Sequence, residues 1–375
     1  MDNLDKINLI VNRLPAPTWN RLRMNESMLE LATTQDKCEP KVALQGSVCF
    51  NKKQLPRVPG KNCCGCVQAD ACPVHGINFA ALPTGMGEEM ARLGEGQRVH
   101  LVADAGRSTA AVTLRYDDGK KCYNTLEIEA KPNSDLTVYM TYISTASAKG
   151  TAVVQTKIAA AKNAKVKLVQ VQLLGHEFLH LNDVGCNLAE DAHFEVLQLQ
   201  LGSAKIYNGV RAELLGDGSC FDAAIAYYSR QAQRLDMNFI ANHYGKNTTC
   251  NMTADGVLQE GAFKIYRGTI DFKNGSAGAI GDEKETVLLL SDDVVNQSIP
   301  LILCSEEDVQ GNHGASIGKL DEELLFYLMS RGFSESDAVA MMAKAKIESI
   351  CRRIDDEETV QLVERYLEGV IADAE

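Results

Sequence analysis

Residues 311–332 read Gly-Asn-His-Gly-Ala-Ser-Ile-Gly-Lys-Leu-Asp-Glu-Glu-Leu-Leu-Phe-Tyr-Leu-Met-Ser-Arg-Gly, and the pattern of the chain changes across this stretch. Its first half is glycine-rich around one histidine, His313, so we expect a tightly turning backbone that leaves the imidazole accessible. Its second half predicts a helix, because Asp321 offers an N-terminal carboxylate and Gly332 follows the last turn. The stretch therefore predicts a junction between a strand-rich region and a helical one.

The region before the junction, from about residue 95, consists of short runs in which apolar and polar residues alternate. Examples are residues 136–143, 166–172, 195–201 and 264–272. Turn-forming residues separate such runs, and we predict turns at 117–119, 132–134, 182–183, 217–218, 255–256 and 274–275. No long helix fits between these breaks, so a sandwich, a barrel or a β-solenoid are the open architectures.

A faint internal repeat favours the solenoid among these options. Residues 188–194 (Leu-Ala-Glu-Asp-Ala-His-Phe) are similar to residues 215–221 (Leu-Gly-Asp-Gly-Ser-Cys-Phe), and the two phenylalanines, Phe194 and Phe221, lie 27 positions apart. This spacing is typical of stacked repeats. We therefore expect the two phenylalanines to lie on neighbouring turns.

The region after the junction is predicted to be helical to its end. The helix over 321–331 is apolar nearly all round, so we expect about half its face to pack on the end of the β region. Ser334 begins a capping sequence that opens a second helix. A third helix follows residues 355–358, with Val360, Val363 and Leu367 on its apolar side.

Two parts of the junction, residues 313–318 and 321–332, together resemble the signature of the SufB/SufD family, scaffold proteins of iron–sulfur cluster assembly. The His-Gly-Ala form at 313–315 resembles the SufD branch. Residues 12–20, which carry the only tryptophan, Trp19, and residues 294–300 are similar to the family as well. The resemblance implies a mainly β chain with three parts: a mixed N-terminal segment (1–94), a right-handed parallel β-helix core (95–318) and an α-helical C-terminal segment (319–375).

The resemblance also implies a function and partners. The chain would be a non-catalytic scaffold that pairs through its core with a SufB-like paralogue and through its C-terminal helices with SufC ATPases, or forms a homodimer when isolated. His313 would lie at the subunit interface, where a transient iron–sulfur cluster is built, with no tightly bound cofactor. Glu285 stands where SufB carries a cysteine ligand, and Phe326, Tyr327 and Arg331 would contact the ATPase.

A His-Glu-x-x-His pattern at residues 176–180 offers a competing function. On a helix, His176 and His180 would hold zinc while Glu177 activated water, as in a zinc metallopeptidase. The pattern upstream is that of a strand, however, and the turn expected at 182–185 leaves too little room for a helix. We therefore predict that residues 176–180 form a surface rung of the β-helix.

Cysteines suggest a third function. Four of the twelve lie in one short segment as Cys63, Cys64, Cys66 and Cys72, with His75 close by. The spacings of Cys63 to Cys66 and of Cys72 to His75 suit pairs of ligands to one metal ion, as in a stand-alone metal or sulfur carrier. Cys304, the cysteine nearest to His313 in the β region, is predicted to be a buried core thiol.

Charge and hydropathy narrow the class of protein. With 38 basic and 50 acidic residues the net charge is −12, which argues against nucleic acid or anionic lipid as partner. The first residues lack the pattern of a signal peptide, and no apolar run approaches membrane-spanning length. We expect a cytoplasmic protein with reduced thiols. A phosphate-binding loop is missing, so any ATP-driven step needs a separate subunit.

Overall fold

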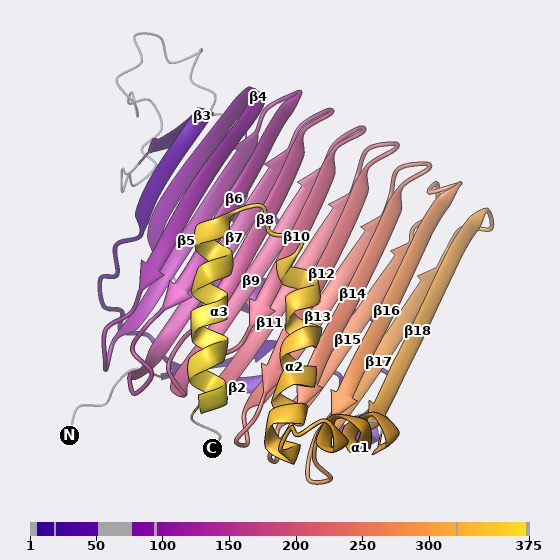
Figure 1. Cartoon of the computed structure of the whole chain (residues 1–375). Coiled ribbons are helices and arrows are strands. Elements are labelled where there is room, and N and C mark those ends of the chain that lie inside the picture. Colours follow the sequence, from indigo (N-terminus) through magenta and orange to yellow (C-terminus); the bar gives the residue numbers. More distant parts are fainter. Residues whose placement is uncertain (1–5, 19, 52–76, 94–95, 320–321, 373–375) are drawn as a thin grey trace.

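Strands β4 to β18 wind into a parallel β-helix in the computed structural model of the chain (Figure 1). The structure describes residues 6–18, 20–51, 77–93, 96–319 and 322–372. One stack holds β5 (Lys121–Ala130), β7 (Lys149–Ala160), β9 (Glu177–Leu188), β11 (Lys205–Leu214), β13 (Arg234–His243), β15 (Phe263–Phe272) and β17 (Val295–Cys304). The other stack holds β6 (Ser134–Ile143), β8 (Lys165–Leu173), β10 (His193–Gln200), β12 (Cys220–Ser229), β14 (Thr249–Leu258), β16 (Ala279–Leu289) and β18 (Val309–Lys319).

The alternation in the sequence decides which side chains enter the β-helix. Successive residues of a strand point to opposite faces, so every second residue lies inside and packs on the same position of the next turn. Phe194 of β10 pairs in register with Phe221 of β12, and their rings stack with centroids 5.6 Å apart. The prediction from the internal repeat is therefore confirmed, and so is the parallel β-helix core.

Among the described residues, a strand caps the N-terminal end of the β-helix and none caps the other end. β4 (Gln97–Arg115) bends at Gly106, whose φ is +104°, and pairs with β5 before the bend and with β6 after it. β3 (Lys41–Asn51) runs antiparallel along both halves of β4 and covers this first turn. At the other end, no strand of the described part of the chain pairs beyond β17 and β18 (Figure 1).

An N-terminal layer covers the outer face of the odd-numbered stack. The hairpin of β1 (Lys6–Val11) and β2 (Ser27–Ala32) packs with the 3-10 helix η5 (Glu88–Leu93) on that stack, and two shorter 3-10 helices, η1 (Asn20–Leu22) and η4 (Phe79–Ala81), flank it. The layer is fastened where Asp236 accepts hydrogen bonds from Asn12 Nδ2 at 2.8 Å and pairs with Arg267 Nη1 at 2.7 Å. This face is therefore closed to solvent along much of its length.

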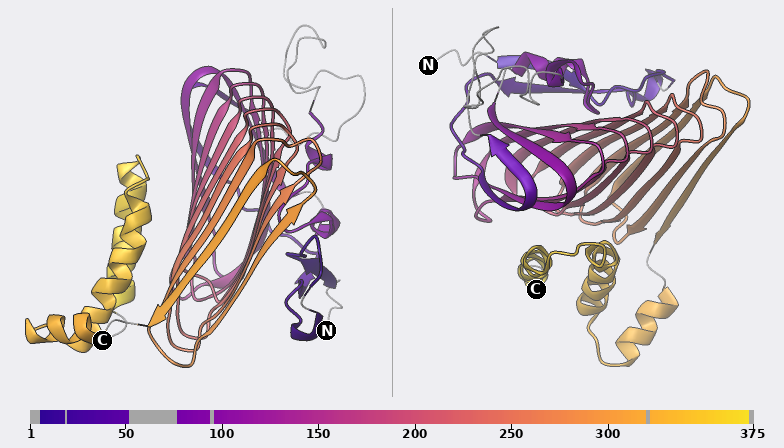
Figure 2. Two further views of the ribbon diagram at one scale, coloured as in Figure 1. Left: turned by 90° about the vertical axis from the view of Figure 1, so that its right-hand side faces the viewer. Right: turned by 90° about the horizontal axis from the view of Figure 1, so that it is seen from above.

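Helices cover part of the opposite face (Figure 2). α2 (Glu335–Cys351) and α3 (Glu357–Ala372) lay Ile347, Val363 and Leu367 on the outer side chains of β8, β10 and β12. Ser334 caps α2 by accepting from the Asp337 backbone N–H, as its sequence predicts. α1 (Glu322–Ser330) contains no buried residue, so the expectation that half its face packs on the β-helix is wrong.

Two predicted turns are strand interior instead. Residues 182–183 lie within β9, where the Asn182 amide hydrogen-bonds inside the β-helix and Asp183 accepts from the Met86 backbone N–H at 2.8 Å. Residues 255–256 lie within β14, where Gly256 leaves room for the ring of Tyr227. Their polar and glycine residues serve packing and buried hydrogen bonds, which overrides their turn preference.

The prediction that Cys304 is a buried core thiol is also wrong, for a different reason. Cys304 belongs to the inward-facing row of β17, but β17 is an edge strand at the uncapped end, and the thiol is exposed. Trp19 lies outside the described residues.

Candidate functional site

His313 lies in the middle of β18 at the uncapped end of the β-helix. It pairs in register with Glu283 of β16, and the same row of β16 contains Ala279 and Val287, which belong to the interior core. His313 therefore occupies a row that faces the interior on every earlier turn. No further turn follows β18 in the described part of the chain, so the side chain is exposed, which confirms the predicted accessibility of the imidazole. The predicted tight turn of the backbone is wrong, because His313 lies within an extended strand.

The carboxyl group of Glu283 lies buried directly beneath this end. Its side chain fits because Gly268, on the facing stack, has no Cβ to collide with it. Burial, followed by the charge of Glu285, raises the pKa of Glu283 to about 8. One of its oxygens, Oε2, has no hydrogen-bond partner within the described part of the chain. A largely protonated carboxyl with an unused oxygen thus adjoins the His313 strand.

Glu285 faces the same interior but is already paired. Its carboxylate forms an ion pair with Lys264 and accepts a hydrogen bond from Ser298. Lys264 also donates to the Gln297 carbonyl at 3.1 Å. The pKa of Lys264 is lowered by burial, against the opposing charge of Glu285. Glu285 pairs in register with Ala315, so Glu283, and not Glu285, is the carboxyl opposite His313.

Glu283 and Lys264 are thus the residues that sequence reasoning missed. A signal was present: residues 282–285 read Asp-Glu-Lys-Glu inside a strand pattern, so any register places either Glu283 and Glu285 or Asp282 and Lys284 inside the β-helix. Buried charges at such positions are paired or perturbed in pKa, which is typical of functional sites.

The predicted ATPase-contact residues gather on an exposed helix. Phe326 of α1 is 74% exposed and Tyr327 is 51% exposed. The Arg331 guanidinium stacks over the Tyr327 ring with its carbon 5.1 Å from the centroid. α1 follows β18 after a gap of two residues, so the exposed helix and the uncapped end are adjacent in the chain (Figure 1).

Residues 176–180 do not form a zinc-peptidase helix. Residues from Glu177 on belong to β9, which confirms the predicted strand, but His180 is fully buried inside the β-helix, so the predicted surface position is wrong. His180 Nδ1 lies 3.2 Å from the Ala152 carbonyl, and burial lowers its pKa to about 4. Glu177 and His180 lie on opposite faces of the strand, so they cannot act together on one metal-bound water.

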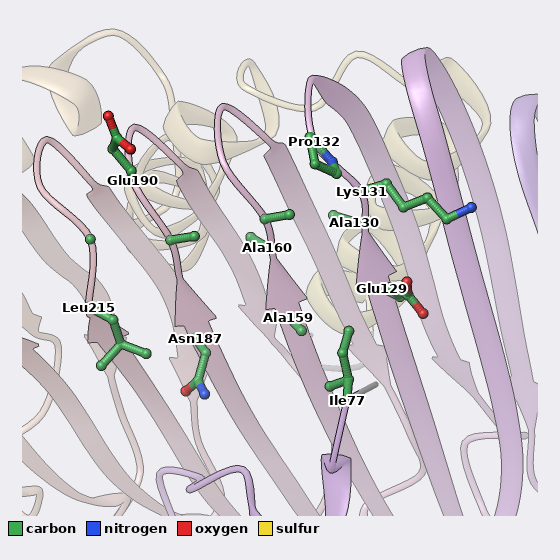
Figure 3. A pocket seen from close by; sticks show the side chains of 13 residues that line it. Ile77, Glu129, Ala130, Lys131, Pro132, Ala159, Ala160, Asn187, Glu190 and Leu215 are labelled. Carbon is green, nitrogen blue, oxygen red and sulfur yellow. The ribbon is translucent and has the colours of Figure 1, made fainter. Parts of the chain in front are cut away.

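The cysteine cluster Cys63, Cys64, Cys66 and Cys72, with His75, lies outside the described residues. A pocket of about 420 Å³ adjoins the next described residue, Ile77, and lies over the carboxyl ends of β5, β7 and β9 (Figure 3). Alanines, among them Ala130 and Ala160, form much of its lining. Few polar groups converge on it, so we do not assign it as the functional site.

Taken together, these features define a class of protein: a parallel β-helix scaffold with one capped end and one open end that carries an imidazole, buried carboxyls and an apolar helix. Residues 113–346 match the family model described as "SUF system FeS cluster assembly, SufBD core domain". The chain belongs to this family of iron–sulfur cluster assembly proteins.

Curated relatives agree with this assignment. The chain is similar to the iron–sulfur cluster assembly protein SufD of Bacillus subtilis (26% identical over 61% of this chain) and to SufBD family proteins of Mycobacterium leprae (25% over 56%) and Staphylococcus haemolyticus (27% over 56%). The matches cover 53%, 24% and 46% of these relatives, so the chain spans about half of their length or less. Among the described residues, no helix is long and apolar enough to cross a membrane.

Proposed function

We propose that this chain is a non-catalytic, SufD-like scaffold subunit that helps to build iron–sulfur clusters in the cytoplasm. The observation that carries the proposal is the open end of the β-helix, where His313 is exposed opposite the buried carboxyl of Glu283. Imidazole and carboxylate are both iron ligands, and an open end leaves room for a second subunit to complete the set. The cluster is cargo in this proposal, and the chain keeps no permanent cofactor.

The partner at this end would be a SufB-like paralogue. β17 and β18 are edge strands with backbone N–H and C=O groups that no further strand satisfies in the described chain. A second β-helix can pair with such edges and extend both sheets. His313 would then lie between the two subunits.

The partner at the helices would be a SufC ATPase. An apolar helix that buries no residue on its own chain is typical of a docking element. Phe326 and Tyr327 would serve as aromatic anchors, with Arg331 beside them. ATP binding would move the docked helices and, through β18, shift the interface that holds His313.

The cluster-building role is tested with His313→Ala. The variant and the wild-type chain are each assembled with the SufB-like and SufC partners of the same organism, and clusters formed from iron and sulfide are measured by absorbance. We expect an intact complex with a much lower cluster yield. Asn312→Ala, next to His313 but on the outer face, is the matched control. An unchanged cluster yield with His313→Ala would remove the ligand role.

The docking role is tested with Tyr327→Asp. Because Tyr327 is exposed, the melting temperature should not change, whereas affinity for the SufC-type ATPase should fall at least about tenfold. Met28→Asp, at an exposed position on the N-terminal hairpin, is the control. If the wild-type chain fails to bind the ATPase both with and without ATP, the proposed partner is wrong.

A further inference from the structure

A second group of metal-ligand side chains lies on the outer face of the even-numbered stack, away from the open end. His193 begins β10, and Cys220 and Asp222 begin β12. Asp222 Oδ2 lies 2.8 Å from His193 Nε2 and 3.7 Å from Cys220 Sγ. All three candidate ligand atoms lie within 4.8 Å of one another. Small movements of these side chains would bring the three atoms to the bond distances of four-coordinate zinc, about 2.0–2.3 Å.

The β-helix itself brings the three residues together. His193 pairs in register with Cys220 on the neighbouring parallel strand, and Asp222 follows Cys220 by two positions, on the same face. Strands hold side chains more precisely than loops do, which is what a metal site requires. The three side chains are partly exposed, so an ion can reach them from solvent.

The next strand orients the carboxylate. Asn251 of β14 pairs in register with Asp222, and its Nδ2 donates to Asp222 Oδ1 at 2.9 Å. This hydrogen bond engages Oδ1, so Oδ2 is the oxygen that faces His193 and Cys220. Metal-binding carboxylates commonly have such an outer partner.

Glu195, two residues after His193 on the same face of β10, is not part of the cluster, because it pairs with Arg353 Nη2 at 2.9 Å.

We propose that His193, Cys220 and Asp222 bind one divalent transition-metal ion of the zinc or ferrous-iron type through nitrogen, sulfur and oxygen. Imidazole and thiolate select such ions over Mg²⁺ and Ca²⁺. The fourth position stays open to water or an added ligand. β12 and β18 are three strand spacings apart, about 15 Å, so this site shares no ligand with His313.

The test uses the full-length chain alone, so it does not depend on the proposed scaffold function. Cobalt(II) is the probe, because a cysteine thiolate bound to tetrahedral cobalt gives a charge-transfer band and strong visible absorption. To remove other thiol sites, the background chain carries Cys63→Ser, Cys64→Ser, Cys66→Ser and Cys72→Ser. We expect one equivalent of cobalt with this band, displaced by one equivalent of zinc.

Variants in this background then assign the ligands. Cys220→Ser should abolish the charge-transfer band, and His193→Gln should weaken cobalt binding at least tenfold. Asn251→Ala should weaken cobalt binding about tenfold, because the Asp222 carboxylate loses the hydrogen bond that orients it. Cys304→Ser, at another exposed cysteine, should change nothing. Because these side chains lie on the surface, circular dichroism should be unchanged in each variant. Failure to bind cobalt, or a charge-transfer band that survives Cys220→Ser, would overturn the proposal.

Discussion

Lys264 and Glu285 form an ion pair that is almost completely buried inside the β-helix. Removing one partner leaves the other charge buried without compensation, so Glu285→Ala should lower the free energy of unfolding by about 3–5 kcal/mol. Replacing both partners by apolar residues, Lys264→Met with Glu285→Leu, should recover most of this loss. Urea unfolding of the three proteins measures both effects.

The measured stability of Glu285→Ala also distinguishes a structural role of Glu285 from a direct role in cluster assembly. If Glu285→Ala proves as stable as the wild type, the ion pair does not stabilise the fold, and a direct role of Glu285 in cluster assembly gains support. Lys319→Ala serves as control, because its pair with Asp292 is exposed and should be worth at most about 1 kcal/mol.

His180 should make the protein sensitive to acid. Its pKa is lowered by burial to about 4, against about 6.5 in the unfolded chain. Unfolding therefore takes up a proton below pH 6.5, so stability falls as pH falls from 6.5 toward 4, by about 3 kcal/mol in total. His180→Phe removes this loss and keeps a ring beside Tyr142, but it gives up the hydrogen bond to the Ala152 carbonyl.

We thus expect a crossover between the two proteins. His180→Phe should be about 1 kcal/mol less stable than the wild type at pH 7.5 and more stable at pH 4.5, measured by urea unfolding at both values. A variant that remains less stable at pH 4.5 would contradict a neutral, buried His180.

Single residues show which features of the site the sequence alone predicts and which it does not. The accessibility of His313 is predicted correctly but for the wrong reason, since the imidazole is exposed because β18 ends the stack and not because the backbone turns at the neighbouring glycines. The partner carboxyl Glu283 could not be chosen over Glu285, since both face the interior and only the register places one opposite His313. The exposure of Cys304 is equally invisible in a strand pattern, because it depends on which strand ends the stack.

At the scale of elements, the N-terminal hairpin should depend on one buried carboxylate. Asp236 holds Asn12, Ser27 and Arg267, the last of which also donates to the Met24 carbonyl at 2.7 Å. Asp236→Ala should cost about 3–5 kcal/mol and leave Arg267 unpaired. Amide hydrogen exchange should accelerate most in β1 and β2, while β8 to β12 stay protected.

The control for this prediction is Lys6→Ala. Its ion pair with Glu30 spans the same hairpin but is exposed, so its loss should leave hydrogen exchange in β1 and β2 nearly unchanged. If Asp236→Ala destabilises all strands equally, the hairpin is part of one cooperative unit with the β-helix rather than a layer fastened at this point.

The strands also show why turn-forming residues do not always predict a turn. Turn residues end strands correctly at 217–218 and 274–275, where the chain passes between the stacks. The same residue types at 182–183 and 255–256 lie within strands. Asp183 faces outward and accepts from Met86 of the N-terminal layer, whereas Gly256 faces the interior and leaves room for the Tyr227 ring. A single strand pattern does not reveal what will pack on each of its faces, since that depends on segments distant in sequence.

The whole molecule is asymmetric along its long axis. β3 closes the first turn, whereas the last turn presents two edge strands (Figure 1). Exposed apolar side chains on these strands include Ile317 and Val295. Monomeric proteins generally protect such edges with charge, bulges or a covering segment. The open end is therefore the face where we expect this chain to associate, with a paralogue in the complex and with itself when isolated.

Self-association of the isolated chain follows from this asymmetry. We expect a concentration-dependent dimer in sedimentation experiments, joined through β17 and β18. Ile317→Lys places a charge in the middle of that contact and should weaken the dimer at least about tenfold, without lowering the melting temperature, because Ile317 is exposed in the monomer. Met28→Lys, exposed on the N-terminal layer, should leave the dimer intact. A wild-type chain that stays monomeric at high concentration, or an Ile317→Lys dimer as tight as the wild type, would mean that the edges of β17 and β18 are protected in another way.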